Sequence, residues 1–300
     1  MSQFVQSQFT NQGKQSHEWL EQAPPAYSVV TQPSAPPSSQ AQVPSRTIEQ
    51  KRQMLDQLAR DHDINPSFKD KLWQINETHI ILLCDDSGSM NAQVDGQTKT
   101  RWDELKKAVT EILDIALIFD PIGMDVHFLN RAPQLSVKFS EQIALSFSAP
   151  PNGGTPLVTK LTTLEQMYHG MPYNKLLIIA TDGEPSDDQS PNYANLRQCV
   201  ARLIQQGYHI GFLVCTDDDS QVRYINDIDR QYQQVDVTDD YRTELREIRR
   251  AQGRNFKFSY GDYIVKLLVG SIDQTMDQLD EHRLLPRIRG FRNSWQCAIL

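Results

Sequence analysis

The sequence predicts an α/β fold, with a doubly wound, mostly parallel sheet and helices on both of its faces. Three short apolar runs, at residues 79–84, 175–181 and 209–215, have the composition of strands that are buried on both sides. Stretches with helical periodicity separate these runs. Strands that alternate with helices in this way indicate right-handed βαβ units.

The remaining elements are predicted in order along the chain. Thr47 and Gln50 form a capping-box pair that starts a helix. Asn65-Pro66 ends this helix, and a second helical stretch reaches Asn76. The apolar spacing further along predicts helix 102–119, strand 125–129, helix 157–168, helix 194–206, helix 222–231, helix 242–252 and an apolar stretch at 263–269.

Composition divides the chain into four parts. Residues 1–45 hold nine Gln, eight Ser and six Pro but only three charged side chains, which predicts a disordered tail. A helical lead-in at 46–76, an α/β domain at 77–270 and a polar, then basic, tail at 271–300 follow.

Charge and hydropathy exclude several classes of protein. The formal net charge of −8 argues against a nucleic-acid partner. No apolar run is long enough to span a membrane as a helix. The first residues lack the charged and apolar regions of a secretory signal, so we expect a cytoplasmic protein.

Carboxylates and hydroxyls follow the predicted strands at their carboxyl ends, where ligands bind in open α/β sheets. Asp85, Ser87 and Ser89 come directly after strand 79–84, and Asp182 follows strand 175–181. Thr155 lies in a Gly-Gly-Thr-Pro loop ahead of a helix. All these groups are oxygen donors, which suit a hard divalent cation. We expect Mg²⁺, with Mn²⁺ or Ca²⁺ as alternatives.

This set resembles the metal-ion-dependent adhesion site of the von Willebrand factor A domain family, whose pattern is Asp-x-Ser-x-Ser, then a Thr, then an Asp. Thr155 stands 66 residues after Ser89, and Asp182 stands 27 residues further on. The resemblance covers about residues 77–270. It implies that the three hydroxyls contact the cation directly and the two aspartates partly through water. It also implies that an acidic residue of a partner protein completes the coordination.

The resemblance therefore predicts a protein-interaction module without enzymatic activity. A metal-dependent hydrolase and a structural, virus-like matrix protein stay open as alternatives. No Gly-x-Ser-x-Gly motif supports a serine hydrolase of the α/β type. We interpret the neighbouring Asp86 and Glu184 as solvated loop residues, with tuning of the charge at the site as the alternative.

The first 45 residues carry two short motifs. Residues Pro24, Pro25, Ala26 and Tyr27 resemble the PPxY ligand of WW domains. Residues Pro33, Ser34, Ala35 and Pro36 resemble the motif that the UEV domain of the ESCRT-I complex binds. Such motifs are shared by viral matrix proteins and trafficking adaptors, and they predict recruitment of those partners.

The last four residues resemble a CaaX box. The sequence Cys-Ala-Ile-Leu begins at Cys297, and its terminal leucine favours geranylgeranylation. The residues upstream are basic, at Arg283, Arg287, Arg289 and Arg292. Because one lipid chain holds a membrane only marginally, a basic patch is a usual second signal. We therefore expect peripheral, lipid-anchored association with the cytosolic face of a membrane.

Overall fold

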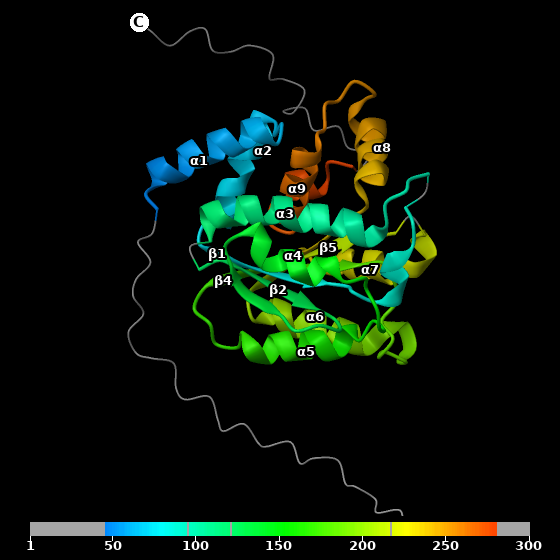
Figure 1. The fold of residues 1–300 in the computed structure, drawn as a ribbon. Helices are drawn as coiled ribbons and strands as arrows, with labels where there is room; N and C mark the ends of the chain where they lie inside the picture. Colours follow the sequence, from blue (N-terminus) through cyan, green and yellow to red (C-terminus); the bar gives the residue numbers. More distant parts are fainter. Residues whose placement is uncertain (1–45, 95, 121, 217, 281–300) are drawn as a thin grey trace, which may run out of the picture. The chain divides into compact units, whose positions relative to one another are not determined.

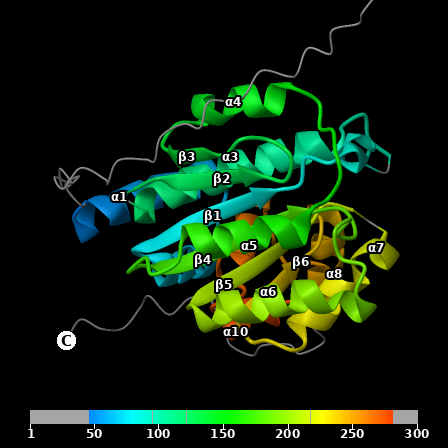
Figure 2. The same ribbon diagram turned by 90° about the horizontal axis from the view of Figure 1, so that it is seen from below.

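The computed structural model describes residues 46–94, 96–120, 122–216 and 218–280. These residues form an α/β fold in which helices cover both faces of a mostly parallel sheet (Figures 1 and 2). The predicted disordered tail and its motifs at Tyr27 and Pro33 lie outside the described residues. The predicted basic segment and the CaaX box at Cys297 do so as well.

In the described residues the sheet has six strands, in the order β3-β2-β1-β4-β5-β6. The strands are β1 (Thr78–Cys84), β2 (Met124–Phe128), β3 (Gln134–Val137), β4 (Asn174–Thr181), β5 (Tyr208–Val214) and β6 (Val235–Thr238). Neighbours pair in parallel except β3, which runs antiparallel to β2. After β1, strands β2 and β3 are added on one side of it. The chain then returns to the other side of β1, where β4, β5 and β6 are added. The junction of β1 and β4 is therefore the topological switch point of the sheet.

The four predicted strands are confirmed as β1, β2, β4 and β5, each within one residue of the predicted ends. The two outer strands β3 and β6 were not predicted. Each has four residues, and β6 has the sequence Val-Asp-Val-Thr, so neither contains an apolar run of the length that marks a buried strand.

Helices fill the connections between the strands. They are α1 (Ile48–Asp61), α2 (Pro66–Lys69), α3 (Arg101–Phe119), α4 (Ser140–Ser148), α5 (Leu157–Met167), α6 (Ala194–Gln205), α7 (Asp219–Asp229), α8 (Tyr241–Gln252), α9 (Tyr260–Val269) and α10 (Gln274–Asp277), with 3-10 helices η1 (Asp70–Ile75), η2 (Gly88–Asn91) and η3 (Pro191–Tyr193). The predicted capping box of Thr47 and Gln50 starts α1, and a second one, of Thr100 and Asp103, starts α3. None of the described helices is long and apolar enough to cross a membrane.

The sheet separates two hydrophobic cores, because successive side chains of a strand point to opposite faces. In β1, Ile80 and Leu82 belong to one core, and Ile81 and Leu83 belong to the other. Helices α1, α3 and α9 cover the first core, and α5, α6 and α7 cover the second (Figures 1 and 2). Burial on both faces explains why the central strands are continuous apolar runs.

Candidate metal-binding site

Two of the predicted loops meet at the carboxyl edge of the sheet, at the junction of β1 and β4. The two strands pair in parallel with Cys84 opposite Ala180, so the residues that follow them start side by side. The backbone N–H of Asp85 donates to the carbonyl of Ala180 at 2.8 Å, which extends the pairing by one residue. Asp85 therefore lies beside the end of β4. Asp182 is the first residue after β4, so the two aspartates start neighbouring loops.

Hydrogen bonds connect four of the five predicted residues. The backbone N–H of Ser87 donates to Asp85 Oδ1 at 2.9 Å. The hydroxyls of Ser87 and Ser89 lie 2.9 Å apart, and Ser89 Oγ donates to Asp182 Oδ1 at 2.8 Å. Ser87 and both aspartates are buried, whereas Ser89 is exposed. The network is therefore reached from solvent at Ser89.

Thr155 lies next to this network without joining it. The N–H of Gly88 donates to the carbonyl of Gly153 at 3.1 Å and holds the Thr155 loop against the Ser87–Ser89 turn. The N–H of Thr155 donates to Ser186 Oγ at 3.1 Å. Among the described residues, no hydrogen bond joins the Thr155 hydroxyl to the other four predicted residues. A ligand between them is what would link it to the network.

Asp85 is the most deeply buried carboxylate of the predicted set. Its Oδ2 accepts a hydrogen bond from Thr181 Oγ1 at 2.7 Å. Burial raises the pKa of Asp85 to about 6, against the hydrogen bonds from Ser87 and Thr181, which lower it. A cation beside this carboxylate would favour its ionised form and oppose the effect of burial.

Arg101 also belongs to the site, although the sequence analysis did not single it out. From the first turn of α3, its Nη1 donates to Asp182 Oδ2 at 2.8 Å, and its Nη2 donates to Thr216 Oγ1 at 2.8 Å. Arg101 directly follows the Thr100 cap, which is visible in the sequence. Its reach to Asp182 depends on the path of the loop between η2 and α3, for which the sequence offers no signal.

The interpretation of Asp86 as a solvated loop residue is wrong. Its side chain is fully buried and accepts hydrogen bonds from the N–H of Asn130 at 2.7 Å and from Asn130 Nδ2 at 3.0 Å. Arg131 Nε lies 3.0 Å from the other carboxylate oxygen. Asp86 thus connects the loop after β1 to the residues that follow β2 through hydrogen bonds and an ion pair. Glu184 is exposed, as expected.

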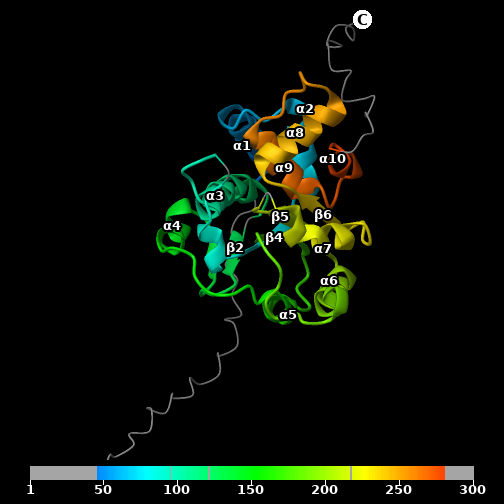
Figure 3. The same ribbon diagram turned by 90° about the vertical axis from the view of Figure 1, so that its right-hand side faces the viewer.

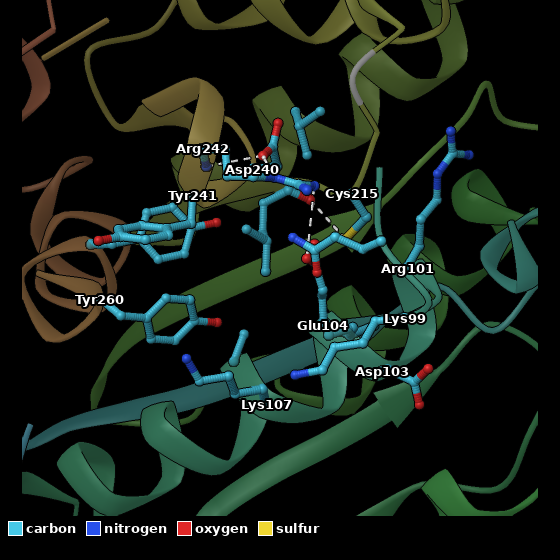
Figure 4. A pocket seen from close by; sticks show the side chains of 16 residues that line it. Lys99, Arg101, Asp103, Glu104, Lys107, Cys215, Asp240, Tyr241, Arg242 and Tyr260 are labelled. Atoms are coloured by element: carbon cyan, nitrogen blue, oxygen red, sulfur yellow. Dashed lines mark hydrogen bonds and ion pairs between the residues drawn. The ribbon is translucent and has the colours of Figure 1, made fainter. Parts of the chain in front are cut away.

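A pocket of about 240 Å³ adjoins the site at Arg101 (Figure 4). The end of β5, with Cys215, and the first turns of α3, α8 and α9 line it. Figure 4 shows Tyr241 and Tyr260 on one side of the pocket and Arg101 on the other. None of the five predicted metal ligands lines this pocket, so the pocket and the predicted metal site are separate spaces that share one side chain.

The donor set determines which ion could bind. In the described part of the chain, no group of three or more His, Cys, Asp or Glu side chains is placed to hold a metal ion. The predicted site instead combines two carboxylates with three hydroxyls, all of them oxygen donors. This chemistry fits Mg²⁺, which accepts oxygen ligands and keeps several waters. It does not fit zinc, which takes nitrogen and sulfur ligands in structural sites.

No protein-family model matches this chain, and no curated protein matches its sequence. The fold and the site define the class directly: an α/β protein with a doubly wound sheet and a cluster of oxygen donors at the switch point of that sheet.

Proposed function

We propose that this chain is a metal-dependent protein-interaction module of the von Willebrand factor A type. It would bind Mg²⁺ through Asp85, Ser87, Ser89, Thr155 and Asp182. The observation that carries the proposal is the hydrogen-bonded series from Ser87 through Ser89 to Asp182, with Asp85 beside it, at the switch point of the sheet. Ligand sites of open α/β sheets lie at this position.

The charge of the site supports a partner with an acidic side chain. Two carboxylates neutralise a divalent cation, and the guanidinium of Arg101 adds a positive charge next to Asp182. A site with excess positive charge and an exposed hydroxyl at Ser89 favours an incoming carboxylate over a neutral group. The partner's Asp or Glu would replace one of the waters that Mg²⁺ keeps.

The metal part of the proposal is tested by thermal unfolding in EDTA and in Mg²⁺. A ligand that binds only the native state at about one hundred times its Kd adds about 2.7 kcal/mol of stability. We expect the wild type to gain several degrees in Tm and the double variant Ser87→Ala, Ser89→Ala to gain nothing. Ser140→Ala with Ser148→Ala is the matched control, because both serines are exposed on α4. An equal response of all three proteins would refute the metal site.

The partner part is tested by affinity capture from cells. We expect a protein that is captured in Mg²⁺, is released by EDTA and is absent from captures with Asp85→Ala. Steady turnover of an ester or phosphate substrate that Asp85→Ala abolishes would instead favour a metal-dependent hydrolase. Self-assembly on membranes into released particles would favour a matrix protein.

The proposal extends to both ends of the chain. A geranylgeranyl group on Cys297 would tether the module to a cytosolic membrane face, and the motifs around Tyr27 and Pro33 would recruit WW-domain and ESCRT-I UEV proteins. Cys297→Ser should then release the protein from cell membranes. Tyr27→Ala should weaken binding to a WW domain in a titration. Unchanged localisation or unchanged affinity would remove the corresponding part of the proposal.

A further inference from the structure

Helix α8 presents a row of arginines on one side. Arg242, Arg246, Arg249 and Arg250 recur at intervals of three and four residues, which places them on one face of the helix. Arg254 follows shortly after the helix ends. The opposite face is buried, at Glu244, Ile248 and Ala251. This basic face stands out in a chain whose formal net charge is −8.

The guanidinium groups of four of these arginines face solvent and are not neutralised by a described carboxylate. Arg246, Arg249, Arg250 and Arg254 are exposed, and no ion pair joins any of them to a carboxylate among the described residues. The acidic Glu244 of the same helix is turned inward, with its Oε1 3.2 Å from Lys266 Nζ. We call the surface formed by Arg242, Arg246, Arg249, Arg250 and Arg254 the arginine face.

The arginine face lines a shallow, open hollow of about 510 Å³, and almost all of the lining residues are arginines. Besides the five arginines it contains only Leu245. Without an aromatic ring, the hollow offers no stacking platform for the bases of a single-stranded nucleic acid. Its lining comes from α8 and from Arg254, two residues beyond the end of this helix, so no second element forms a groove for an acidic peptide. A membrane surface with anionic headgroups is a flat array of negative charges. It can bind such a row of arginines without aromatic rings and without a groove.

The chain leaves the described region at the same end of α8. Gln252 Nε2, in the last residue of the helix, donates to the carbonyl of Leu279 at 2.8 Å. Asp280 Oδ2 lies 3.6 Å from the buried Lys266 Nζ. Residue 280 is thus held close to the carboxyl end of α8.

We propose that the arginine face is a docking surface for an anionic lipid leaflet. The guanidinium groups contact the phosphates and carboxylates of the headgroups. Helix α8 lies on the side of the sheet that α1, α2 and α9 cover, and α5 and α6 lie on the opposite side (Figures 1 and 3). Docking through α8 therefore leaves α5 and α6 exposed to solvent. This inference goes beyond the proposed metal-dependent interaction and does not depend on it.

The test is co-sedimentation of the full chain, made in bacteria so that it carries no lipid, with vesicles in EDTA. One set of vesicles is phosphatidylcholine alone, and the other contains phosphatidylserine. The variant replaces Arg246, Arg249, Arg250 and Arg254 by Gln. The matched control replaces four exposed arginines by Gln: Arg52 and Arg60 of α1, Arg223 of α7 and Arg230 at the end of α7. Both variants change the net charge equally, and all eight positions are on the surface.

We expect the wild type and the control to bind the phosphatidylserine vesicles, and high salt to release both. Each basic residue near an anionic leaflet strengthens binding roughly fivefold, so the arginine-face variant should lose at least about tenfold. Absence of wild-type binding, or equal losses in both variants, would overturn the proposal. So would tighter binding of soluble poly-glutamate or RNA than of the vesicles, which would assign the face to an acidic protein or to a nucleic acid.

Discussion

Arg101 and Asp182 form an ion pair at the centre of the proposed metal site, with Nη1 2.8 Å from Oδ2. The second oxygen of Asp182 accepts the Ser89 hydroxyl at 2.8 Å. Both carboxylate oxygens are therefore engaged by groups of the protein itself. A cation that approaches Asp182 must share it with a guanidinium or displace that guanidinium toward the neighbouring pocket. We infer that Arg101 sets the affinity of the site for metal.

Removal of this charge should strengthen metal binding. Between a divalent cation and a unit charge about 6 Å apart, repulsion at an effective dielectric constant near 20 is about 5 kcal/mol. Salt and movement of the side chain reduce this repulsion, and we expect Arg101→Gln to bind Mg²⁺ about tenfold more tightly. Isothermal titration measures the change.

Arg101→Lys is the matched control, because it keeps the positive charge and loses the paired donors. Its affinity for Mg²⁺ should stay close to that of the wild type. If Arg101→Gln bound Mg²⁺ more weakly than the wild type, Arg101 would support the metal site and not compete with it.

The residues of this site that directly follow a buried strand can be recognised in the sequence. Asp85, Ser87 and Ser89 directly follow a buried strand, and the neighbouring strand brings Asp182 to the same edge. Arg101 stands 81 residues from Asp182 along the chain, and only the folded loop between η2 and α3 brings them together. A single charged residue at the start of a helix gives no indication of such a contact.

The burial of Asp86 also could not be predicted from the sequence. An aspartate in a loop is solvated in most proteins, and the sequence alone gives no reason to expect otherwise. The partners that satisfy its charge, Asn130 and Arg131, follow the next strand of the fold. Burial of a charge depends on partners that meet only in three dimensions, whereas burial of an apolar strand is visible in its composition.

Gly153 should be irreplaceable by a residue with a side chain. Its φ is +122°, and a Cβ there would lie 2.5 Å from Asn130 Cγ, whose amide donates to Asp86. We expect Gly153→Ala to lower the free energy of unfolding by about 3 kcal/mol, because backbone strain and a clash add. The displaced loop carries Thr155, so the Mg²⁺-dependent gain in Tm should fall as well.

Gly207→Ala separates strain from clash. Gly207 has a φ of +80°, and nothing lies within 4 Å of a Cβ at that position. This variant should lose only about 1 kcal/mol in urea unfolding and should keep its response to Mg²⁺. Equal losses in the two variants would show that the contact with Asn130 is unimportant.

Lys266 should be needed to hold the charge of Glu244 in the core. Both side chains are buried, and Lys266 Nζ lies 3.2 Å from Glu244 Oε1. Burial raises the pKa of Glu244 to about 8 although Lys266 lowers it, and Lys266 also lies 3.6 Å from Asp280 Oδ2. Lys266→Met removes this shared ammonium, which costs about 3 kcal/mol. The double variant Lys266→Met, Glu244→Gln should recover part of this loss in urea unfolding. A double variant no more stable than the single one would contradict the pairing.

His79 should make stability depend on pH above neutrality. Its Nδ1 lies 2.9 Å from Asp120 Oδ2 and its Nε2 lies 3.1 Å from Asp125 Oδ2. Only the protonated imidazole donates from both nitrogens. Burial lowers the pKa of His79, but the hydrogen bonds to the two aspartates outweigh burial and raise the pKa to about 9 from 6.5.

The raised pKa of His79 makes the free energy of unfolding fall as the pH rises. Because the folded state binds the proton more tightly than the unfolded state, the contribution is complete below pH 6.5 and is lost as the pH rises through about 9. The wild type should lose up to about 3 kcal/mol over this window relative to His79→Gln, which has no proton to lose. Urea unfolding of both proteins at several pH values measures the difference. If the free energy of unfolding had the same pH dependence in both proteins, His79 would be neutral in the folded state at these pH values. Asp120 and Asp125 would then not stabilise a protonated imidazole.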